Sequence, residues 1–111
     1  MPDRFSAIVR ADGDVPVIDL DGDIDGDAEA ALLDAYDRAA DGSDRLALNF
    51  GPTRYINSTG LAVIVQILAR ARAAGVAIHA FGLTDHYRHI FEITRLADFV
   101  VLATDEAGAV A

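Results

Sequence analysis

The chain has 111 residues, of which 52% are hydrophobic and 24% charged, and its 18 acidic and 9 basic residues give a formal charge of −9. This length and composition predict a single globular domain over residues 1–111. The negative charge disfavours nucleic acid and anionic membranes as partners, and the lack of cysteine excludes disulfides and thiolate metal sites.

Two stretches bear on the location of the protein. The longest mostly apolar stretch, residues 61–68, is interrupted by Gln66 and is too short to span a bilayer. The first residues, Met1-Pro2-Asp3-Arg4, lack the basic segment and apolar run of a signal peptide. We therefore expect a cytoplasmic protein that does not bind membranes.

In chain order, the first predicted element is an antiparallel hairpin. Residues 5–10 alternate between apolar and polar, and a second such run follows at 15–20. Asp12-Gly13 lies between the two runs, and this dipeptide is typical of hairpin turns. The acidic segment from Asp19 to Asp27 contains Gly22 and Gly26, which predicts a loop.

Helical periodicity predicts three main helices: residues 28–40 ending before Gly42, about 58–74 ending at Gly75, and a helix capped by Thr84. The faces expected to be buried are Leu32, Ala35, Tyr36 and Ala39 in the first, Leu61, Ile64, Val65 and Leu68 in the second, and Tyr87, Ile90 and Phe91 in the third. Val63 and Ile67 lie beside the stripe of the second helix. We expect them to pack internally rather than to extend a partner surface.

Short apolar runs predict further strands at 45–50, 76–81 and 99–102, and a short tail helix at 105–109. The run at 76–81 is apolar on both faces except at His79, so an interior position in the sheet is expected. Strands that alternate with helices predict an α/β fold. We expect a mixed, mostly parallel sheet of about five strands, with an antiparallel edge hairpin and three to four helices.

The stretch from Arg54 to Leu61 is the candidate functional segment, because a strand pattern stops there and the longest helix begins. Asn57, Ser58 and Thr59 are all residues whose side-chain oxygens can cap a helix N-terminus. The positive end of the helix dipole would also stabilise a phosphate at this point. Residue chemistry alone leaves Ser58 as a cap or as a regulated hydroxyl.

Other chemistries fit the sequence poorly. Asp21, Asp23, Asp25 and Gly26 match the first half of a calcium loop, but Leu32 occupies the position that requires a bidentate glutamate. His86 and His89 stand three residues apart, yet zinc needs three or four protein ligands. For a hydrolase, Ile56 replaces the first glycine of the nucleophile elbow around Ser58. We expect no metal, no cofactor and no enzymatic activity.

Several segments resemble the STAS domain family, specifically the small single-domain anti-sigma factor antagonists of bacteria. The resemblance covers nearly the whole chain and rests on the order and spacing of its motifs. These are Gly22-Asp23-Ile24-Asp25, Leu46-Ala47-Leu48-Asn49-Phe50, Ile56-Asn57-Ser58-Thr59-Gly60-Leu61, Ala73 to Gly75, and Ile93-Thr94-Arg95-Leu96. The chain departs from the family pattern at Asn57, where Asp is common, and at Arg95, where Gly is frequent.

The resemblance implies a partner-switching protein. The unmodified form would bind an anti-sigma factor serine kinase, which itself binds ATP, and phosphorylation of Ser58 would release it. Thr59 is the fallback acceptor, and a phosphatase would restore the hydroxyl. The expected partner-binding residues are Asp23, Asp25, Asp27, Asn57, Ser58, Thr59 and Leu61.

Asn57 keeps a second interpretation open, because an amide can hydrogen-bond but cannot act as a carboxylate base. In this alternative the chain is a STAS subunit that is never phosphorylated. It would be an accessory or scaffold protein of a stress-signalling assembly or of a transporter ATPase. A homodimer is open under both interpretations.

Overall fold

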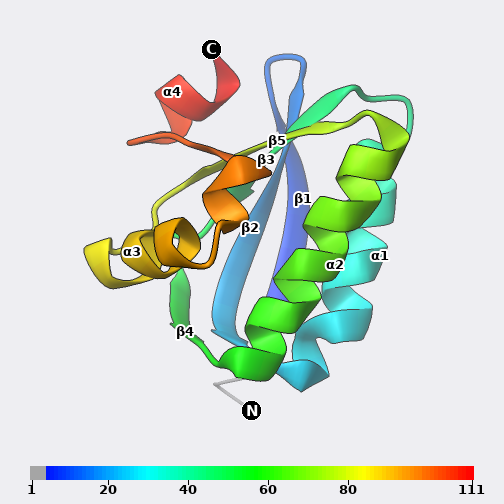
Figure 1. Cartoon of the computed structure of the whole chain (residues 1–111). Helices are drawn as coiled ribbons and strands as arrows, with labels where there is room; N and C mark the ends of the chain where they lie inside the picture. The colour runs from blue at the N-terminus through cyan, green and yellow to red at the C-terminus, as the bar shows by residue number, and fades with distance from the viewer. Residues whose placement is uncertain (1–4) are drawn as a thin grey trace.

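The structure is a computed structural model that describes residues 5–111, so the segment Met1 to Arg4 inspected for a signal peptide lies outside the described residues. Six strands form one sheet, accompanied by four α-helices and two short 3-10 helices (Figure 1). The strands are β1 (Ser6–Asp12), β2 (Val15–Ile24), β3 (Arg45–Asn49), β4 (Thr53–Ile56), β5 (Ala77–Phe81) and β6 (Val101–Leu102). The α-helices are α1 (Glu29–Ala40), α2 (Ser58–Ala74), α3 (Asp85–Ile93) and α4 (Glu106–Val110), and the 3-10 helices are η1 (Gly26–Ala28) and η2 (Leu96–Asp98).

The sheet order is β1-β2-β3-β5-β6, and β4 pairs with the end of β2. β1 and β2 are antiparallel, whereas the other pairs are parallel. The predicted fold class is therefore confirmed, including the edge hairpin and the interior position of β5. The sheet has one strand more than predicted. The additional strand is β4, which was not recognised in the sequence before α2 because it has only four residues.

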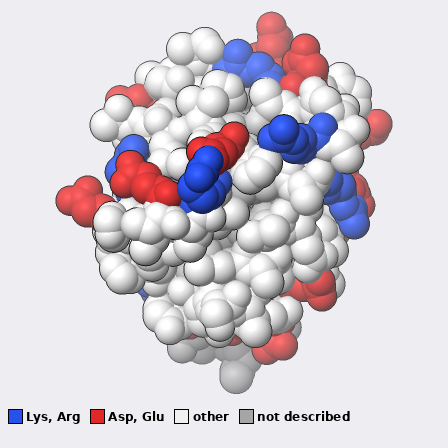
Figure 2. Space-filling model, in the orientation of Figure 1, with Lys and Arg blue, Asp and Glu red and all other residues white. Residues whose placement is uncertain are grey.

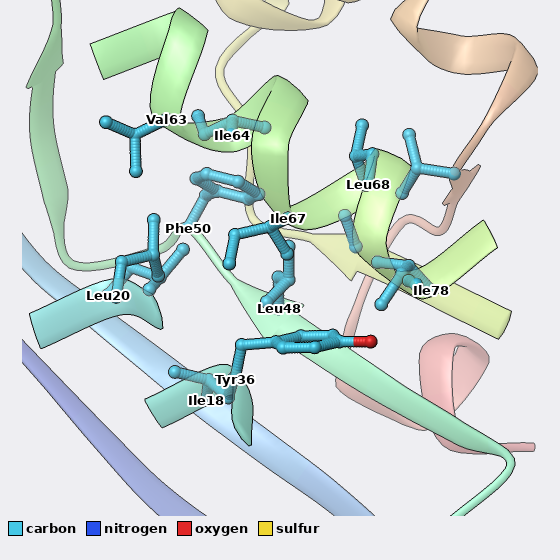
Figure 3. Close-up of a cluster of buried hydrophobic side chains, with 14 of the residues drawn as sticks. Ile18, Leu20, Tyr36, Leu48, Phe50, Val63, Ile64, Ile67, Leu68 and Ile78 are labelled. Atoms are coloured by element: carbon cyan, nitrogen blue, oxygen red, sulfur yellow. The ribbon is translucent and has the colours of Figure 1, made fainter. Parts of the chain in front are cut away.

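The main core lies between one face of the sheet and the helices. α1 and α2 run side by side, joined at their surfaces by Gln66–Glu29 and Arg70–Asp37 contacts (Figure 1). Figure 3 shows side chains from these two helices and from the sheet meeting in one cluster. Phe91 brings α3 into the same cluster, with its ring edge-on to Phe50 at 5.9 Å between centroids.

The predicted buried face of α1 is confirmed, whereas on α3 only Phe91 is buried and Tyr87 and Ile90 are half-buried. The predicted face of α2 is partly wrong. Val65 is 45% exposed, whereas Val63 and Ile67 are buried, as expected for internal packing. The buried positions of α2 are Gly60, Val63, Ile64, Ile67, Leu68 and Ala71. The helix is rotated relative to the prediction because its first turn packs backbone to backbone at Gly60, which a count of apolar residues does not register.

The acidic segment is not the loop that was predicted. β2 continues through it to Ile24, because Leu20, Gly22 and Ile24 alternate as buried positions and β4 supplies a parallel partner. A bulge between Gly22 and Asp23 lets the strand bend there. The acidic side chains lie between the buried ones, as in a strand, but the two glycines at positions 22 and 26 had indicated a loop.

The chain between α3 and α4 also differs from the prediction. β6 begins at Val101 rather than at Phe99, because residues 96–98 form η2 and Phe99 is 43% exposed. Arg95, at the position where glycine was expected from the resemblance, has a left-handed backbone with φ 67°. The tail helix is confirmed with a shift of one residue, and Asp105 is its N-cap.

The second face of the sheet is covered in part by α4. Two arginines hold this helix at its ends: Arg10 donates to both oxygens of Glu106 at 2.8 Å, and Arg45 donates to the carbonyl of Ala111 at 3.0 Å. Arg10 also donates to Asp19 at 2.7 Å. These hydrogen bonds from Arg10 lower the pKa of Asp19 and bring the pKa of Glu106 down to about 2.

Within residues 5–111, no helix is long and apolar enough to cross a membrane.

Candidate functional site

The N-terminus of α2 is built around Asn57. This residue has an extended backbone, and its carbonyl accepts the first helical hydrogen bond from the Leu61 N–H at 2.8 Å. Its side-chain Oδ1 accepts from the Gly60 N–H, also at 2.8 Å. Asn57 is therefore the N-cap of the helix, and the first helical residue is Ser58.

The two hydroxyls that follow the cap are held differently. Thr59 donates its hydroxyl to Asn57 Oδ1 at 2.8 Å. Ser58 is exposed, and its hydroxyl has no hydrogen-bond partner in the part of the chain that the structure describes. An incoming group can therefore reach the Ser58 oxygen without breaking a contact, whereas at Thr59 it must displace the bond to Asn57.

Close backbone contact fixes the first turn of α2 against the end of β2. A Cβ at residue 60 would lie 1.9 Å from the carbonyl oxygen of Ile24, so only glycine fits there. The Asn57 N–H donates to the same carbonyl at 3.2 Å. Gly26 lies next to Thr59, since a Cβ on this glycine would be 3.7 Å from the Thr59 hydroxyl oxygen. The segment around η1 and the Ser58 turn therefore form one continuous surface.

The three acidic residues expected at the site have different surroundings. Asp25 is the N-cap of η1, and its Oδ1 accepts from the Asp27 N–H at 2.9 Å. Asp27 is exposed in the first turn of that 3-10 helix. Asp23 lies on β2 and pairs with Arg54 of β4 at 3.6 Å. The fold thus places Asp25 and Asp27 beside the start of α2, and Asp23 on the strand that leads there.

The apolar part of the site is larger than the sequence predicted. Leu61 is half-buried against the main core, so only part of its side chain is accessible. Two residues not selected from the sequence are more exposed, Tyr55 on β4 at 55% and Val65 on α2 at 45%. No clear signal in the sequence pointed to Tyr55, because residues 53–56 do not alternate between polar and apolar and both Arg54 and Tyr55 are exposed in β4.

The distribution of charge distinguishes one part of the surface. Figure 2 shows Arg, Asp and Glu side chains gathered in the upper half and at the rim of this face. The lower area, over the N-terminal half of α2, is largely uncharged, whereas β4 carries the exposed Arg54. For a chain with a formal charge of −9, an uncharged area of this size next to an exposed hydroxyl favours contact with another protein.

The fold does not bring together a set of metal ligands at the calcium-like acidic segment or at the two histidines of α3 within the described residues. Among residues 5–111, no group of three or more His, Cys, Asp or Glu side chains is placed to hold a metal ion. His86 stacks edge-on against Tyr87, with 4.9 Å between the ring centroids. What the site offers chemically is a free hydroxyl at the positive end of a 17-residue helix, where a phosphoryl group would be stabilised by unpaired N–H groups.

Comparison with known proteins identifies the family and the fold. A family model described as "Mlab, STAS domain" matches residues 7–103. A search of curated protein sequences finds no match. Among solved structures, an anti-sigma factor antagonist from Mycobacterium paratuberculosis is 21% identical with a TM-score of 0.76, and the alignment covers 99% of this chain and 94% of that one.

Two structures of SpoIIAA are also similar. The unphosphorylated form of this anti-sigma factor antagonist is 14% identical with a TM-score of 0.66, covering 94% of this chain and 91% of that one. The phosphorylated form of SpoIIAA, a cell fate determinant of Bacillus, is 18% identical with a TM-score of 0.64, covering 94% of this chain and 95% of that one. At these identities the likeness shows a common fold.

Proposed function

The chain belongs to the STAS domain family, and on this basis we propose that it is an anti-sigma factor antagonist that switches partners through phosphorylation of Ser58. In this proposal the unmodified protein binds an anti-sigma factor kinase, which supplies ATP, and the phosphorylated form is released. A phosphatase returns the protein to its binding form. The observation that carries the proposal is the free, exposed hydroxyl of Ser58 at the start of α2.

The surroundings of Ser58 explain how a phosphate could break an interface without unfolding the domain. A phosphoryl group adds about −1.5 to −2 charges, which the N-terminal dipole of α2 stabilises. Because the hydroxyl makes no hydrogen bond within the described residues, its modification breaks no hydrogen bond of the fold. A partner that packs against this turn must instead bury the added charge. A penalty of about 4 kcal/mol would weaken binding about a thousandfold.

The proposed contact surface consists of the Ser58 turn and its neighbours. Its residues are Asp23, Asp25, Asp27, Asn57, Ser58, Thr59 and Leu61, to which the structure adds Tyr55 and Val65 as exposed apolar positions. The acidic members favour a basic patch on the partner, and the uncharged area over α2 favours apolar contact (Figure 2).

The proposal is tested with purified protein, ATP and the anti-sigma factor kinase encoded near the gene. Mass spectrometry should show one added phosphoryl group at Ser58, which is absent in Ser58→Ala and retained in Thr59→Val. Ser58→Ala should bind the kinase constitutively, and Ser58→Glu should bind weakly. Ser43→Glu, which adds the same charge in the loop between α1 and β3, should bind as the wild type does. Equal affinity of Ser58→Ala and Ser58→Glu would refute the switch.

The second candidate is an accessory or scaffold subunit that is not phosphorylated, in a stress-signalling assembly or with a transporter ATPase. The observation that favours it is Asn57, whose carboxamide is used as a helix cap and provides no carboxylate next to the hydroxyl. Stable binding to such a complex, together with no phosphoryl transfer to Ser58 by any co-encoded kinase, would select this function over the first.

A further inference from the structure

β1 is an edge strand that is neither short nor bulged. It stands first in the sheet order, and within the described residues only β2 pairs with it. It has seven residues in continuous register with β2, without a bulge or a proline, and Ile8 near its centre is 57% exposed. Its two charged side chains are Arg10 and Asp12, and the guanidinium of Arg10 is bonded to Asp19 and Glu106. Natural edge strands are usually short, charged, bulged or covered. By contrast, β6 at the opposite edge has only two residues.

The hairpin geometry decides which backbone groups of β1 point outward. Residues Gly13 and Asp14 form a two-residue turn, so Asp12 and Val15 are the closing pair and exchange both hydrogen bonds. Alternation then directs the even-numbered residues of β1 toward β2. The N–H and C=O groups of Ala7, Val9 and Ala11 point away from the sheet. Pro16 lies opposite Ala11, which agrees with this phase because proline has no N–H to donate to β1.

We propose that this edge binds β1 of a second copy of the chain, so that two sheets join into one across a two-fold axis at Val9. The pairing is antiparallel. Val9 lies opposite Val9 of the partner subunit, and Ala7 lies opposite Ala11 of the partner subunit. Every residue of the seven-residue strand then has a partner, and all three outward-facing residues exchange backbone hydrogen bonds.

The side chains suit this arrangement. Ile8 faces Arg10 of the partner subunit, whose aliphatic stem can cover the exposed isoleucine while its guanidinium stays bonded to Glu106 and Asp19. Ser6 faces Asp12 of the partner subunit, which allows a hydroxyl-to-carboxylate bond. No residue of like charge lies directly opposite another. A two-fold axis at Arg10 would instead place the two arginines face to face.

A second copy is favoured over an unrelated strand because the edge complements itself. The side chains of the residues whose backbone groups point outward do not block this edge, because Ala7 and Val9 pack against the main core and Ala11 is small, so a second strand can approach without steric conflict. The face that carries Ile8 also carries Arg10 and Asp12, and these are the residues that the two-fold axis pairs with Ile8 and Ser6. The inference does not depend on Ser58 or on any kinase.

The test is the oligomeric state of the full chain, measured by sedimentation velocity over a range of concentrations. The wild type should associate to twice the 11.8 kDa chain mass. Ile8→Lys places a lysine opposite Arg10 of the partner subunit and should raise the dimer Kd at least about tenfold. The matched control is Val101→Lys on β6, where the replaced side chain is 55% exposed. It adds the same charge and should leave Kd within about twofold of the wild type.

Hydrogen exchange supplies a second measurement that does not depend on a substitution. In the dimer, the amides of Ala7, Val9 and Ala11 should be protected, and dilution should remove this protection. The amides of Ile8 and Arg10, which are bonded to β2, should stay protected in both states. A wild type that is monomeric at all concentrations would overturn the proposal and leave the edge for an extended segment of another protein. So would a dimer that Val101→Lys disrupts and Ile8→Lys does not.

Discussion

The cap at Asn57 gives the most direct test of how the site is built. Replacement of Asn57 by Ala removes the acceptor of the Gly60 N–H and of the Thr59 hydroxyl, both at 2.8 Å. Loss of an N-cap side chain costs about 1 kcal/mol of folding free energy. For a chain of 111 residues this corresponds to a melting temperature lower by about 3–6 °C.

Two further substitutions separate the cap from other effects of the residue. Asn57→Asp keeps an acceptor in the same place and adds a negative charge at the positive end of the helix dipole. Its free energy of unfolding should therefore be between that of the wild type and about 1 kcal/mol higher. Asn57→Gly should cost only a few tenths of a kcal/mol, about 0.3, because glycine tolerates the cap conformation and leaves the N–H groups open to water.

The assay is urea unfolding followed by circular dichroism. The dependence of the unfolding free energy on urea concentration is compared among the variants first, because the free energies are comparable only if these slopes agree. Thr84→Ala is the matched control, since this cap of α3 accepts from the Tyr87 N–H at 3.3 Å, a longer bond whose loss should cost less. The reasoning would be refuted if Asn57→Ala were as stable as the wild type, or if Asn57→Asp were less stable than Asn57→Ala.

Three more substitutions test contacts that position the site or hold the fold. Gly60→Ala should cost about 3 kcal/mol or prevent folding, because its Cβ would overlap the Ile24 carbonyl, and urea unfolding measures the loss. Arg95→Gly should raise the free energy of unfolding by about 0.5–1 kcal/mol, since the left-handed backbone strains any side chain, and an unchanged urea midpoint would contradict this. The Glu106 carboxylate, with its pKa lowered to about 2 by Arg10, stabilises the folded protein above its ordinary pKa, and this contribution is lost as the pH falls toward 2. Arg10→Met should therefore lose less stability than the wild type between pH 6 and pH 3, and parallel pH profiles would show that the arginine does not cause the shift.

Much of the fold followed from local patterns in the sequence. The hairpin, the N-cap Thr84 and the C-cap Gly75 each depend on the conformational preference of one or two residues. The structure places both caps as predicted, and it places the hairpin turn one residue later, at Gly13-Asp14. The Asn57-Ser58-Thr59 segment was located at the start of α2 for the same reason. Short-range stereochemistry is enough for these features, because the residues that determine them are adjacent in the chain.

The errors arose where a distant segment decides the outcome. Val65 looked like a core residue by periodicity, but the contact of Gly60 with Ile24 rotates α2 and leaves Val65 exposed. The continuation of β2 beyond Leu20 requires β4, which is too short to be recognised by itself. In both cases the information lies in pairing between segments about 30 residues apart along the chain, about which a local window of sequence is silent.

Apart from β4, the sequence by itself determined the order of strands and helices, the family resemblance and the position of Ser58 at a helix entrance, because these depend on residue type and spacing. Only the structure showed which hydroxyl is free. The carboxamide of Asn57 is oriented by the helix turn it caps, and it holds Thr59 while leaving Ser58 open. The exposed edge of β1 also became visible only in the assembled sheet, since whether a strand lies at an edge depends on which strands pair with it.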